Sequence, residues 1–411
     1  MATLNSHIEL AHKALAINGG ARGLKRALPP RQLFDSEALK MVQAVFQDSW
    51  DSGQDFGFQG KYEELYTKAF VEFQGGGFAD AVSSGTAALL IALMALDLPG
   101  GSDAVISPVT DPGGVSPLLF MGLTPVIADS CPGSFNTGPE EFLKVITPKT
   151  KVAVITHLAG IPVEMDAICV IAKSRGIKII EDCSQAHGAM YKGRRVGTFG
   201  DAAFFSTMFS KTHATGGCGG MVYTRDEQMY WRMRSLADRG KPFNCKNADM
   251  KDPGRFLFPA LNFNQNEIAC ALGLATLKKL QPTIEQRLAI VRELNTGLAR
   301  CKAVGPVDIP EHAVPSPFFL TVRVDRDKIN VSKVQFAQAV RAEGVWVNPD
   351  YKYVISEWDW MRGHVKAGTA TPNASAFREE TFNILFNERF SDSDIDDVIN
   401  CFLKVDSVYA M

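Results

Sequence analysis

Short apolar runs that end in polar residues are the feature that most restricts the fold of this chain. Two of them, Ile177–Ile180 and Ala202–Phe205, have the length of a buried strand. The first is followed directly by two carboxylates and the second by a hydroxyl and a lysine-containing turn. Open α/β sheets bind ligands at the carboxyl ends of their strands. We therefore expect one crevice to collect the polar residues that follow these runs: Asp182, Gln185, Ser206 and Lys211.

The rest of the chain alternates strand-like and helix-like stretches, which is typical of βαβ units. Further apolar runs are Ala104–Ser107, Thr124–Ala128 and Lys151–Thr156. Apolar positions at helical spacing predict the helices Asp35–Gln47, Glu63–Phe73, Thr86–Leu96, Ala167–Ser174, Asp226–Leu236 and Ile268–Leu280. A polar link is expected over Trp50–Gly57. Towards the C-terminus we expect a strand at Phe319–Val324, a helix at Lys333–Glu343, a strand edge at Trp346–Asn348 and a helix at Ser393–Leu403.

A small-residue turn, Ser84-Gly85-Thr86, stands between a predicted strand and a predicted helix. Backbone amides at a helix N-terminus attract anions, and a glycine there lets a phosphate approach closely. The alternative is a plain helix cap that binds nothing. The sequence of the turn by itself leaves both interpretations open.

Composition excludes several classes of protein. With 411 residues and 46% hydrophobic residues the chain can fill two domains, and a net charge of −2 gives no basis for binding polyanions. No apolar run reaches the roughly 18 residues that span a membrane. Residues 1–20 mix charged and apolar positions, so we expect no signal peptide. The eight cysteines are scattered without metal-ligand pairing, which predicts no metal site and free thiols in the cytoplasm.

The segment Ile180–Tyr223 resembles the signature of the sugar aminotransferase family, also called the DegT or StrS family. That signature is an acidic pair, a glutamine three residues after the aspartate, and F-S-x-x-x-x-K before a glycine-rich turn. Here it is formed by Glu181, Asp182, Gln185, Phe205, Ser206 and Lys211, followed by Gly216, Gly217, Gly219 and Gly220. The matching blocks extend from about Ile17 to about Cys401. Members of this family are pyridoxal-phosphate enzymes of fold type I.

The resemblance implies an α/β protein with the fold type I aminotransferase architecture. It implies a large cofactor-binding domain, residues 1–284 with an N-terminal arm, built on a mostly parallel seven-strand sheet. A small C-terminal α/β domain would take residues 285–411. The active site would lie at the interface of a homodimer.

The resemblance also gives each site residue a role. Lys211 would form the Schiff base with pyridoxal 5'-phosphate, and Asp182 would keep the pyridine nitrogen protonated. Gln185 would hydrogen-bond the ring hydroxyl. The phosphate would bind to Gly85, Thr86 and Ser206, and to Asn262 of the neighbouring subunit.

The implied reaction moves an amino group, from L-glutamate, to the carbonyl of a sugar. Two alternatives stay open on the residues alone. One is a pyridoxamine-phosphate-dependent sugar dehydratase, a branch of the family that has histidine in place of the lysine, so that Lys211 argues against it. The other is a non-catalytic or regulatory protein on the same fold, against which the joint presence of Lys211, Asp182 and Gln185 argues.

Ala260 replaces a glycine of the family pattern, and three further departures bear on the choice of acceptor. Asp111 stands where an aromatic residue usually stacks on the cofactor ring, so that Thr110, Pro112 or a glycine peptide would cover that face. Asn264 replaces an arginine, and Asn348–Tyr351 replaces a His-Tyr pair. Sugar nucleotides are the commonest acceptors in the family. The departures favour another acceptor, such as the eight-carbon sugar acid 8-oxo-3,8-dideoxy-octulosonate of lipopolysaccharide synthesis, or an inosose.

Overall fold

A seven-stranded sheet forms the centre of the protein, in a computed structural model that describes residues 12–366 and 369–411. Its spatial order is β1-β9-β8-β5-β4-β2-β3. The strands are β1 (Phe78–Val82), β2 (Asp103–Ile106), β3 (Thr124–Ile127), β4 (Thr150–Thr156), β5 (Lys178–Asp182), β8 (Ala202–Ser206) and β9 (Gly220–Thr224). Only β9 pairs antiparallel to both of its neighbours, and every other neighbouring pair is parallel. The predicted mostly parallel seven-strand sheet is therefore confirmed. The prediction that there is no signal peptide concerns residues 1–20, of which residues 1–11 lie outside the described part.

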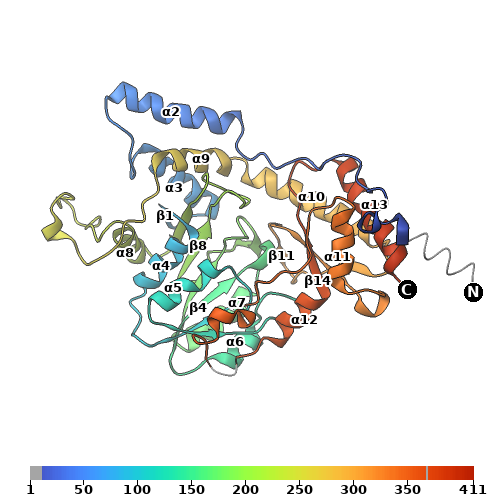
Figure 1. Cartoon of the computed structure of the whole chain (residues 1–411). Coiled ribbons are helices and arrows are strands. Elements are labelled where there is room, and N and C mark those ends of the chain that lie inside the picture. Colours follow the sequence, from blue (N-terminus) through green and yellow to red (C-terminus); the bar gives the residue numbers. More distant parts are fainter. Residues whose placement is uncertain (1–11, 367–368) are drawn as a thin grey trace, which may run out of the picture.

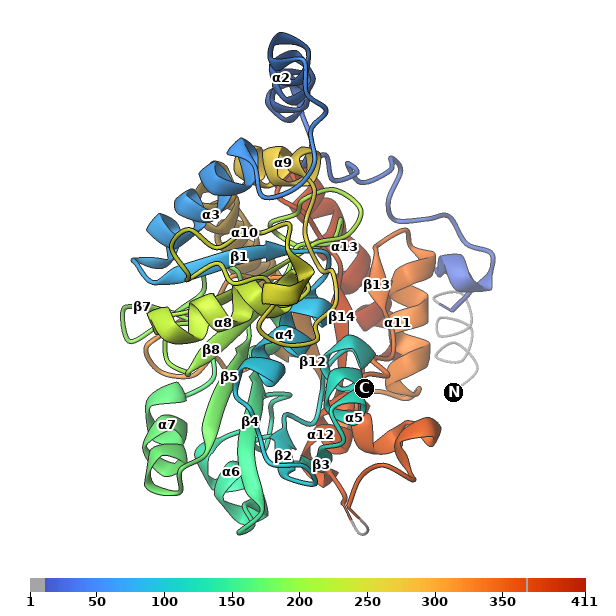
Figure 2. The same ribbon diagram turned by 90° about the vertical axis from the view of Figure 1, so that its left-hand side faces the viewer.

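Helices cover both faces of this sheet (Figures 1 and 2). Along β4, Val152 and Val154 pack into the core under one set of helices, whereas Ala153 and Ile155 pack into the core under the other. Side chains alternate between the faces of a strand, so a strand covered on both sides reads as a continuous apolar run. One face carries α4 (Gly85–Ala95), α5 (Ser116–Phe120) and α8 (Glu227–Ala237), and the other carries α3 (Lys61–Gln74), α6 (Pro139–Val145), α7 (Met165–Ser174) and α9 (Glu267–Leu277).

The helices begin largely where the sequence predicts, but three of them end elsewhere, among them α13 (Asp392–Tyr409), which continues past the predicted end at Leu403. Asp35 caps α2 (Ser36–Ser52) by accepting from the backbone of Glu37 and Ala38. This helix continues past Gln47 to a left-handed glycine, Gly53, so the predicted polar link over Trp50–Gly57 is wrong in its first residues. The helix predicted over Ile268–Leu280 ends earlier, at Leu277, as α9, and the long helix predicted from about Glu285 starts earlier, as α10 (Leu280–Leu298).

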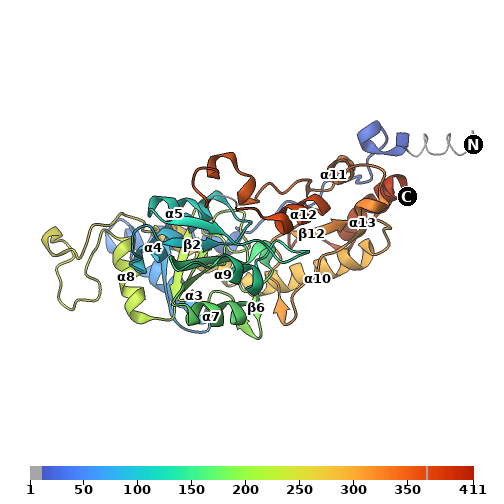
Figure 3. The same cartoon turned by 90° about the horizontal axis from the view of Figure 1, so that it is seen from below.

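A second sheet lies at the other end of the molecule, beyond the long helix α10 (Figure 3). Its order is β10 (Val304–Pro306), β12 (Leu320–Val324), β14 (Thr381–Ile384) and β13 (Val347–Asn348). It shares a core with α10, α11 (Lys333–Ala342) and α13 (Asp392–Tyr409), and the arm residues Leu15, Leu24 and Leu28 pack into this same core. The division of the chain between residues 284 and 285 stays a prediction.

The remaining elements are short. A third sheet joins β11 (Ala313–Val314), β6 (Met190–Tyr191) and β7 (Arg194–Arg195), and α12 (Pro372–Glu380) leads into β14. A long loop between α8 and α9 extends away from the body of the molecule (Figure 1). Within residues 12–366 and 369–411, no helix combines the length and the apolar composition needed to cross a membrane.

Candidate active site

The carboxyl ends of β4, β5 and β8 open into one cavity of about 220 Å³. Its lining contains all the site residues that the sequence predicts in one chain: Gly85, Thr86, Asp182, Gln185, Ser206 and Lys211. Parallel strands present their carboxyl ends at the same edge of a sheet, which is why residues far apart in sequence meet there. Asn262 does not line this cavity. Its predicted contact with the phosphate of a partner subunit stays a prediction.

Asp182 is the last residue of β5 and is only 5% exposed. Its Oδ2 accepts from the hydroxyls of Thr110 and Thr156, each at 3.4 Å, and its Oδ1 accepts from the Ser184 backbone N–H at 3.0 Å. Burial raises the pKa of Asp182, while the Ser184 hydrogen bonds and then the charge of Lys211 oppose that rise. A cation that enters the cavity would therefore stabilise the charged form of this buried carboxylate.

Lys211 lies in the turn between β8 and β9 and is 8% exposed. Its Nζ stands 4.8 Å from the centre of the Phe318 ring, and no hydrogen-bond acceptor of the described residues reaches it. Burial lowers the pKa of Lys211, and the charges of Asp182 and Asp111 partly offset this effect. A lowered pKa increases the fraction of neutral amine, which is the nucleophilic form.

The turn Ser84-Gly85-Thr86 is both a helix cap and an opening for an anion. Ser84 caps α4 through its Oγ, which accepts from the Ala87 backbone N–H at 3.0 Å. A β-carbon on Gly85 would lie 2.8 Å from Cβ of Ser206, so glycine is needed for the close approach of α4 to the end of β8. Gly85 and Thr86 line the cavity at the first turn of α4, where the backbone amides of a helix have no partner within the helix and a phosphate can bind.

Gln185 is held in one orientation by the turn after β4. Its Oε1 accepts from the Ala159 backbone N–H at 2.9 Å, and its Nε2 donates to the Tyr351 hydroxyl at 3.4 Å. Ala159 has a φ of 59°, a backbone conformation that few residues other than glycine adopt. Because the carbonyl oxygen is already engaged, the side of Gln185 that is left to contact a ligand is its amide N–H.

The position at which an aromatic residue is usual belongs to a short helical turn. Asp111 caps this turn by accepting from the Gly113 backbone N–H at 2.9 Å. Thr110, Asp111, Gly113 and Gly114 line the cavity, whereas Pro112 does not. Of the groups predicted to cover the cofactor ring, the threonine and the glycine peptides line the cavity, and which of them covers the ring stays a prediction.

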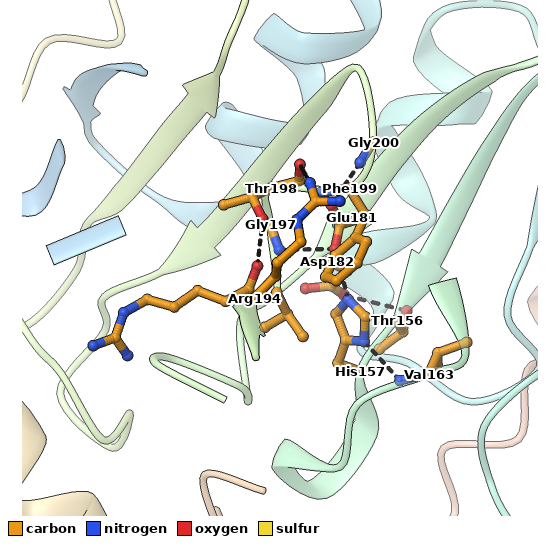
Figure 4. Close-up of polar contacts among 12 residues, drawn as sticks. Thr156, His157, Val163, Glu181, Asp182, Arg194, Gly197, Thr198, Phe199 and Gly200 are labelled. Carbon is orange, nitrogen blue, oxygen red and sulfur yellow. Dashed lines mark hydrogen bonds and ion pairs between the residues drawn. The ribbon is translucent and has the colours of Figure 1, made fainter. Parts of the chain in front are cut away.

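Glu181, the other member of the acidic pair, belongs to a closed network beside the cavity (Figure 4). It accepts from the backbone N–H groups of Gly197, Phe199 and Gly200, each at 2.7 Å. His157 lies 3.1 Å from it through Nε2, and the Nδ1 of His157 accepts from the Val163 N–H, so Nε2 carries the proton and donates. Cys183 brings a third metal-ligating group close to these two, but the carboxylate oxygens of Glu181 are already engaged.

The sequence did not identify several residues that shape the cavity. Thr156 and Ser184 hold Asp182, and Tyr351 holds Gln185. Thr156 ends an apolar run, and that position is the one signal that was available for it. Tyr351 comes from a segment 166 residues away, so no local pattern points to its contact.

The residues of this cavity fit pyridoxal phosphate. The cofactor needs an amine, a carboxylate for its ring nitrogen and donors for its phosphate. Lys211 offers an amine that no acceptor of the described residues engages, Asp182 offers a buried carboxylate, and the first turn of α4 offers backbone amides at the cavity. The fold together with this site defines a fold type I aminotransferase that uses pyridoxal phosphate.

Comparison with known proteins agrees with this class. A model of the DegT/DnrJ/EryC1/StrS aminotransferase family matches residues 34–403. This chain belongs to that family and is a sugar aminotransferase. The spore coat polysaccharide biosynthesis protein SpsC of Bacillus subtilis is 28% identical over 374 residues, covering 89% of this chain and 94% of SpsC.

Two further proteins are similar to this chain. A GDP-perosamine synthase of Caulobacter vibrioides is 33% identical over 244 residues, which cover 59% of this chain and 63% of that protein. The X-ray structure of an aminotransferase from Psychrobacter cryohalolentis superimposes with a TM-score of 0.83 at 27% identity, covering 91% of this chain and 97% of the other.

Proposed function

We propose that this enzyme transfers the amino group of L-glutamate to the carbonyl of a nucleotide-linked sugar. The observation that carries the proposal is the cavity in which the Lys211 amine and the Asp182 carboxylate are buried together. The similarity to a GDP-perosamine synthase supports a sugar nucleotide as the acceptor.

Bound pyridoxal phosphate supplies an aldehyde for joining to an amine and a ring that withdraws electrons from the carbon carrying the transferred nitrogen. In our proposal Lys211 holds the resting cofactor and then moves a proton with its Nζ. Its lowered pKa suits that task, because a general base works best when its pKa lies near the working pH. The carboxylate of Asp182 would keep a proton on the ring nitrogen, and in return the ring would compensate the buried charge.

The other site residues would hold and orient the cofactor. Gln185 would donate from Nε2 to the ring hydroxyl, since its Oε1 is occupied by Ala159. The backbone of Gly85 and Thr86 and the hydroxyl of Ser206 would bind the phosphate. A doubly charged phosphate requires several donors, so a further one is expected from outside the chain.

We assign that further donor to Asn262 of a second subunit. Oδ1 of Asn262 accepts from both the backbone N–H and the Nδ2 of Asn264, at 3.2 Å and 2.7 Å. Asn264 is in turn held by Gln59, which donates to its Oδ1 at 3.0 Å. Within the described residues this arrangement leaves Nδ2 of Asn262 without an acceptor, and such a donor suits a phosphate. The residue that replaces the usual arginine thus orients its neighbour.

A second acceptor class has its own support. Asp111 puts a carboxylate on the cavity wall, and Lys211 is the only cationic side chain that lines this cavity among the described residues. Carboxylates bind sugar hydroxyls well and repel anionic groups. An inosose carries no anionic group, and an eight-carbon sugar acid such as 8-oxo-3,8-dideoxy-octulosonate, used for lipopolysaccharide, carries one carboxylate where a sugar nucleotide carries a diphosphate, so both would suit this wall better. All eight cysteines are free thiols, which supports a cytoplasmic location for the enzyme.

The test is a comparison of acceptors on one enzyme preparation. Enzyme loaded with pyridoxal phosphate is supplied with L-glutamate and with a keto-sugar nucleotide, the eight-carbon keto-sugar acid or an inosose. The release of 2-oxoglutarate is then followed. We expect sustained release with the sugar nucleotide. Release only with one of the other carbonyls would reassign the acceptor, and no release with any of them would overturn the proposal.

A further inference from the structure

The segment before α2 brings Arg31 to the turn that bears Lys211. Its guanidinium donates from Nη1 to the carbonyl oxygen of Lys211 at 2.6 Å and from Nη2 to that of Thr212 at 2.9 Å. Its Nε donates to Oε1 of Glu388 at 3.1 Å. Arg31 and Lys211 are 180 residues apart, so this contact forms only when the N-terminal arm is docked.

Glu388 connects Arg31 to a second arginine. Its Oε2 accepts from Nη1 of Arg287, on α10, at 3.0 Å. Arg287 is buried and donates from Nε to the Pro317 carbonyl oxygen at 2.7 Å and from Nη2 to the Phe318 carbonyl oxygen at 2.8 Å. Every guanidinium nitrogen of Arg287 therefore has an acceptor.

This network holds Lys211 from two sides. Arg31 fixes its backbone carbonyl, and Arg287 fixes the backbone of Phe318, whose ring lies 4.8 Å from the Lys211 ammonium. Burial alone would raise the pKa of Glu388, but the two guanidinium groups outweigh burial and lower it. Burial lowers the pKa of Arg287 to about 10, against the opposing charge of Glu388. Glu388 and Arg287 thus remain charged near neutral pH.

We propose that Arg31, Glu388 and Arg287 are positioning residues that set the direction of the Lys211 amine. The inference rests on the proposed role of Lys211. It goes beyond that role in making the reactivity of Lys211 depend on the docking of the N-terminal arm and of the C-terminal segment around Glu388. The fork of a guanidinium suits two adjacent carbonyl oxygens, and a lysine ammonium cannot reproduce it.

The chain offers a matched control. Arg26 also joins the arm to the C-terminal part, since its Nη1 lies 2.7 Å from Oδ1 of Asp394, but its polar contacts among the described residues do not include the Lys211 turn. We would compare Arg31→Met, Arg31→Lys and Glu388→Gln with Arg26→Met, all as holoenzymes. The readouts are the pH midpoint of the bound cofactor's absorbance, kcat and KM for L-glutamate, and the thermal unfolding temperature.

We expect Arg31→Met and Glu388→Gln to lower kcat by about 10- to 100-fold, the loss expected from a reacting group displaced by up to about 1 Å. KM should change little, and the absorbance midpoint should shift by more than about half a pH unit. Arg31→Lys should recover part of the loss, and Arg26→Met should leave both readouts unchanged. If Arg31→Met does not fold, Glu388→Gln decides, because it keeps the size of the side chain.

Two results would overturn the inference. One is an unchanged kcat and midpoint in Glu388→Gln and in any Arg31 variant that folds. The other is an equal change of kcat and midpoint in Arg26→Met, which would show that the network only attaches the arm to the rest of the fold. Failure of the proposed function itself looks different, because then the unmodified enzyme would show no transamination, or Lys211→Ala would retain it.

Discussion

At the scale of single residues, the burial of Asp182 serves the reaction but lowers the stability of the protein without cofactor. The pKa of Asp182 is raised by burial. An acid whose pKa is higher in the folded than in the unfolded state binds its proton more tightly when folded. Its contribution to stability is therefore lost as the pH rises through that interval, and at neutral pH the carboxylate costs stability.

Asp182→Asn should therefore affect stability and activity in opposite directions. Without cofactor, the variant should unfold at a higher temperature than the unmodified chain at pH 7, since the buried carboxylate charge is removed, and this difference should shrink as the pH falls towards 4. An amide cannot keep the ring nitrogen protonated, so kcat should fall by orders of magnitude while the cofactor stays bound. Calorimetry at several pH values and single-turnover kinetics check both parts. A variant with full activity would contradict the assigned role.

Lys211→Ala should abolish transamination and leave the fold intact. The amine that joins the cofactor is lost, while the cavity wall changes only by a shorter side chain. The measurement is 2-oxoglutarate release, with circular dichroism for the fold. Lys333→Met is a suitable control because Lys333 is also buried, with its Nζ 3.1 Å from the Pro349 carbonyl oxygen, outside the cavity. Activity in Lys211→Ala at the unmodified rate would refute its role.

A site residue could be predicted from sequence where a local pattern marks it, and not where distant segments bring it to the site. Asp182, Gln185, Ser206 and Lys211 follow apolar runs within one stretch, so a local pattern identified them. Thr110 reaches Asp182 from 72 residues away, and Arg31 reaches Lys211 from 180. Contacts of this kind depend on how segments pack and leave no periodic signal.

At the scale of elements, the junction of α4 with β8 depends on Gly85. A β-carbon there would lie 2.8 Å from Cβ of Ser206. Gly85→Ala should lower the free energy of unfolding by about 1–3 kcal/mol, the usual cost of overpacking, and should weaken cofactor binding by moving the start of α4. Urea denaturation and a cofactor titration measure the two effects. Gly100→Ala is the control, because a β-carbon at that position meets no atom within 4 Å. Equal effects at both glycines would contradict the packing argument.

Glu181 holds the loop that leads into β8, so we expect its substitution to lower the stability of the fold. Each of its oxygens accepts two hydrogen bonds: Oε1 from Phe199 and Gly200, and Oε2 from Gly197 and His157. In Glu181→Gln the amide would face two donors whichever way it turned. With about 1–3 kcal/mol for each unsatisfied buried group, we expect a loss of about 2–6 kcal/mol in unfolding free energy. Denaturation by urea measures it, and a loss below about 1 kcal/mol would show that the loop finds other acceptors.

Elements were predictable where their signal is local. Buried strands such as β4 and β5 are continuous apolar runs, and Asp35 and Asp226 cap the helices that they precede. The exact position of the break between α9 and α10 was not predictable, because neither glycine nor proline separates Leu277 from Leu280. Strands β6, β7 and β11 are two residues long, too short for any periodicity.

At the scale of the whole molecule, α2 lies on α9 and apart from the rest of the fold (Figures 1 and 2). It carries large apolar side chains that remain exposed: Leu39 at 58%, Phe46 at 38% and Trp50 at 71%. Leu261 is also 61% exposed, next to Asn262. Grouped exposed apolar residues mark interaction surfaces. Together with the free amide of Asn262, this surface suits a two-fold contact with a second copy of the chain.

We therefore expect the holoenzyme to be a homodimer that shares its active sites. Trp50→Glu should shift light scattering from the mass of two chains towards one, because a charge cannot be buried in an apolar contact without a large cost. Trp360→Glu, at a tryptophan that is 45% exposed outside α2, should leave the mass unchanged. Asn262→Ala should weaken cofactor binding in the intact dimer by about 10-fold, the loss of one charge-assisted hydrogen bond. Cofactor affinity should fall again in Trp50→Glu, since separation removes the same donor. A monomer that keeps its cofactor and its activity would refute the shared site.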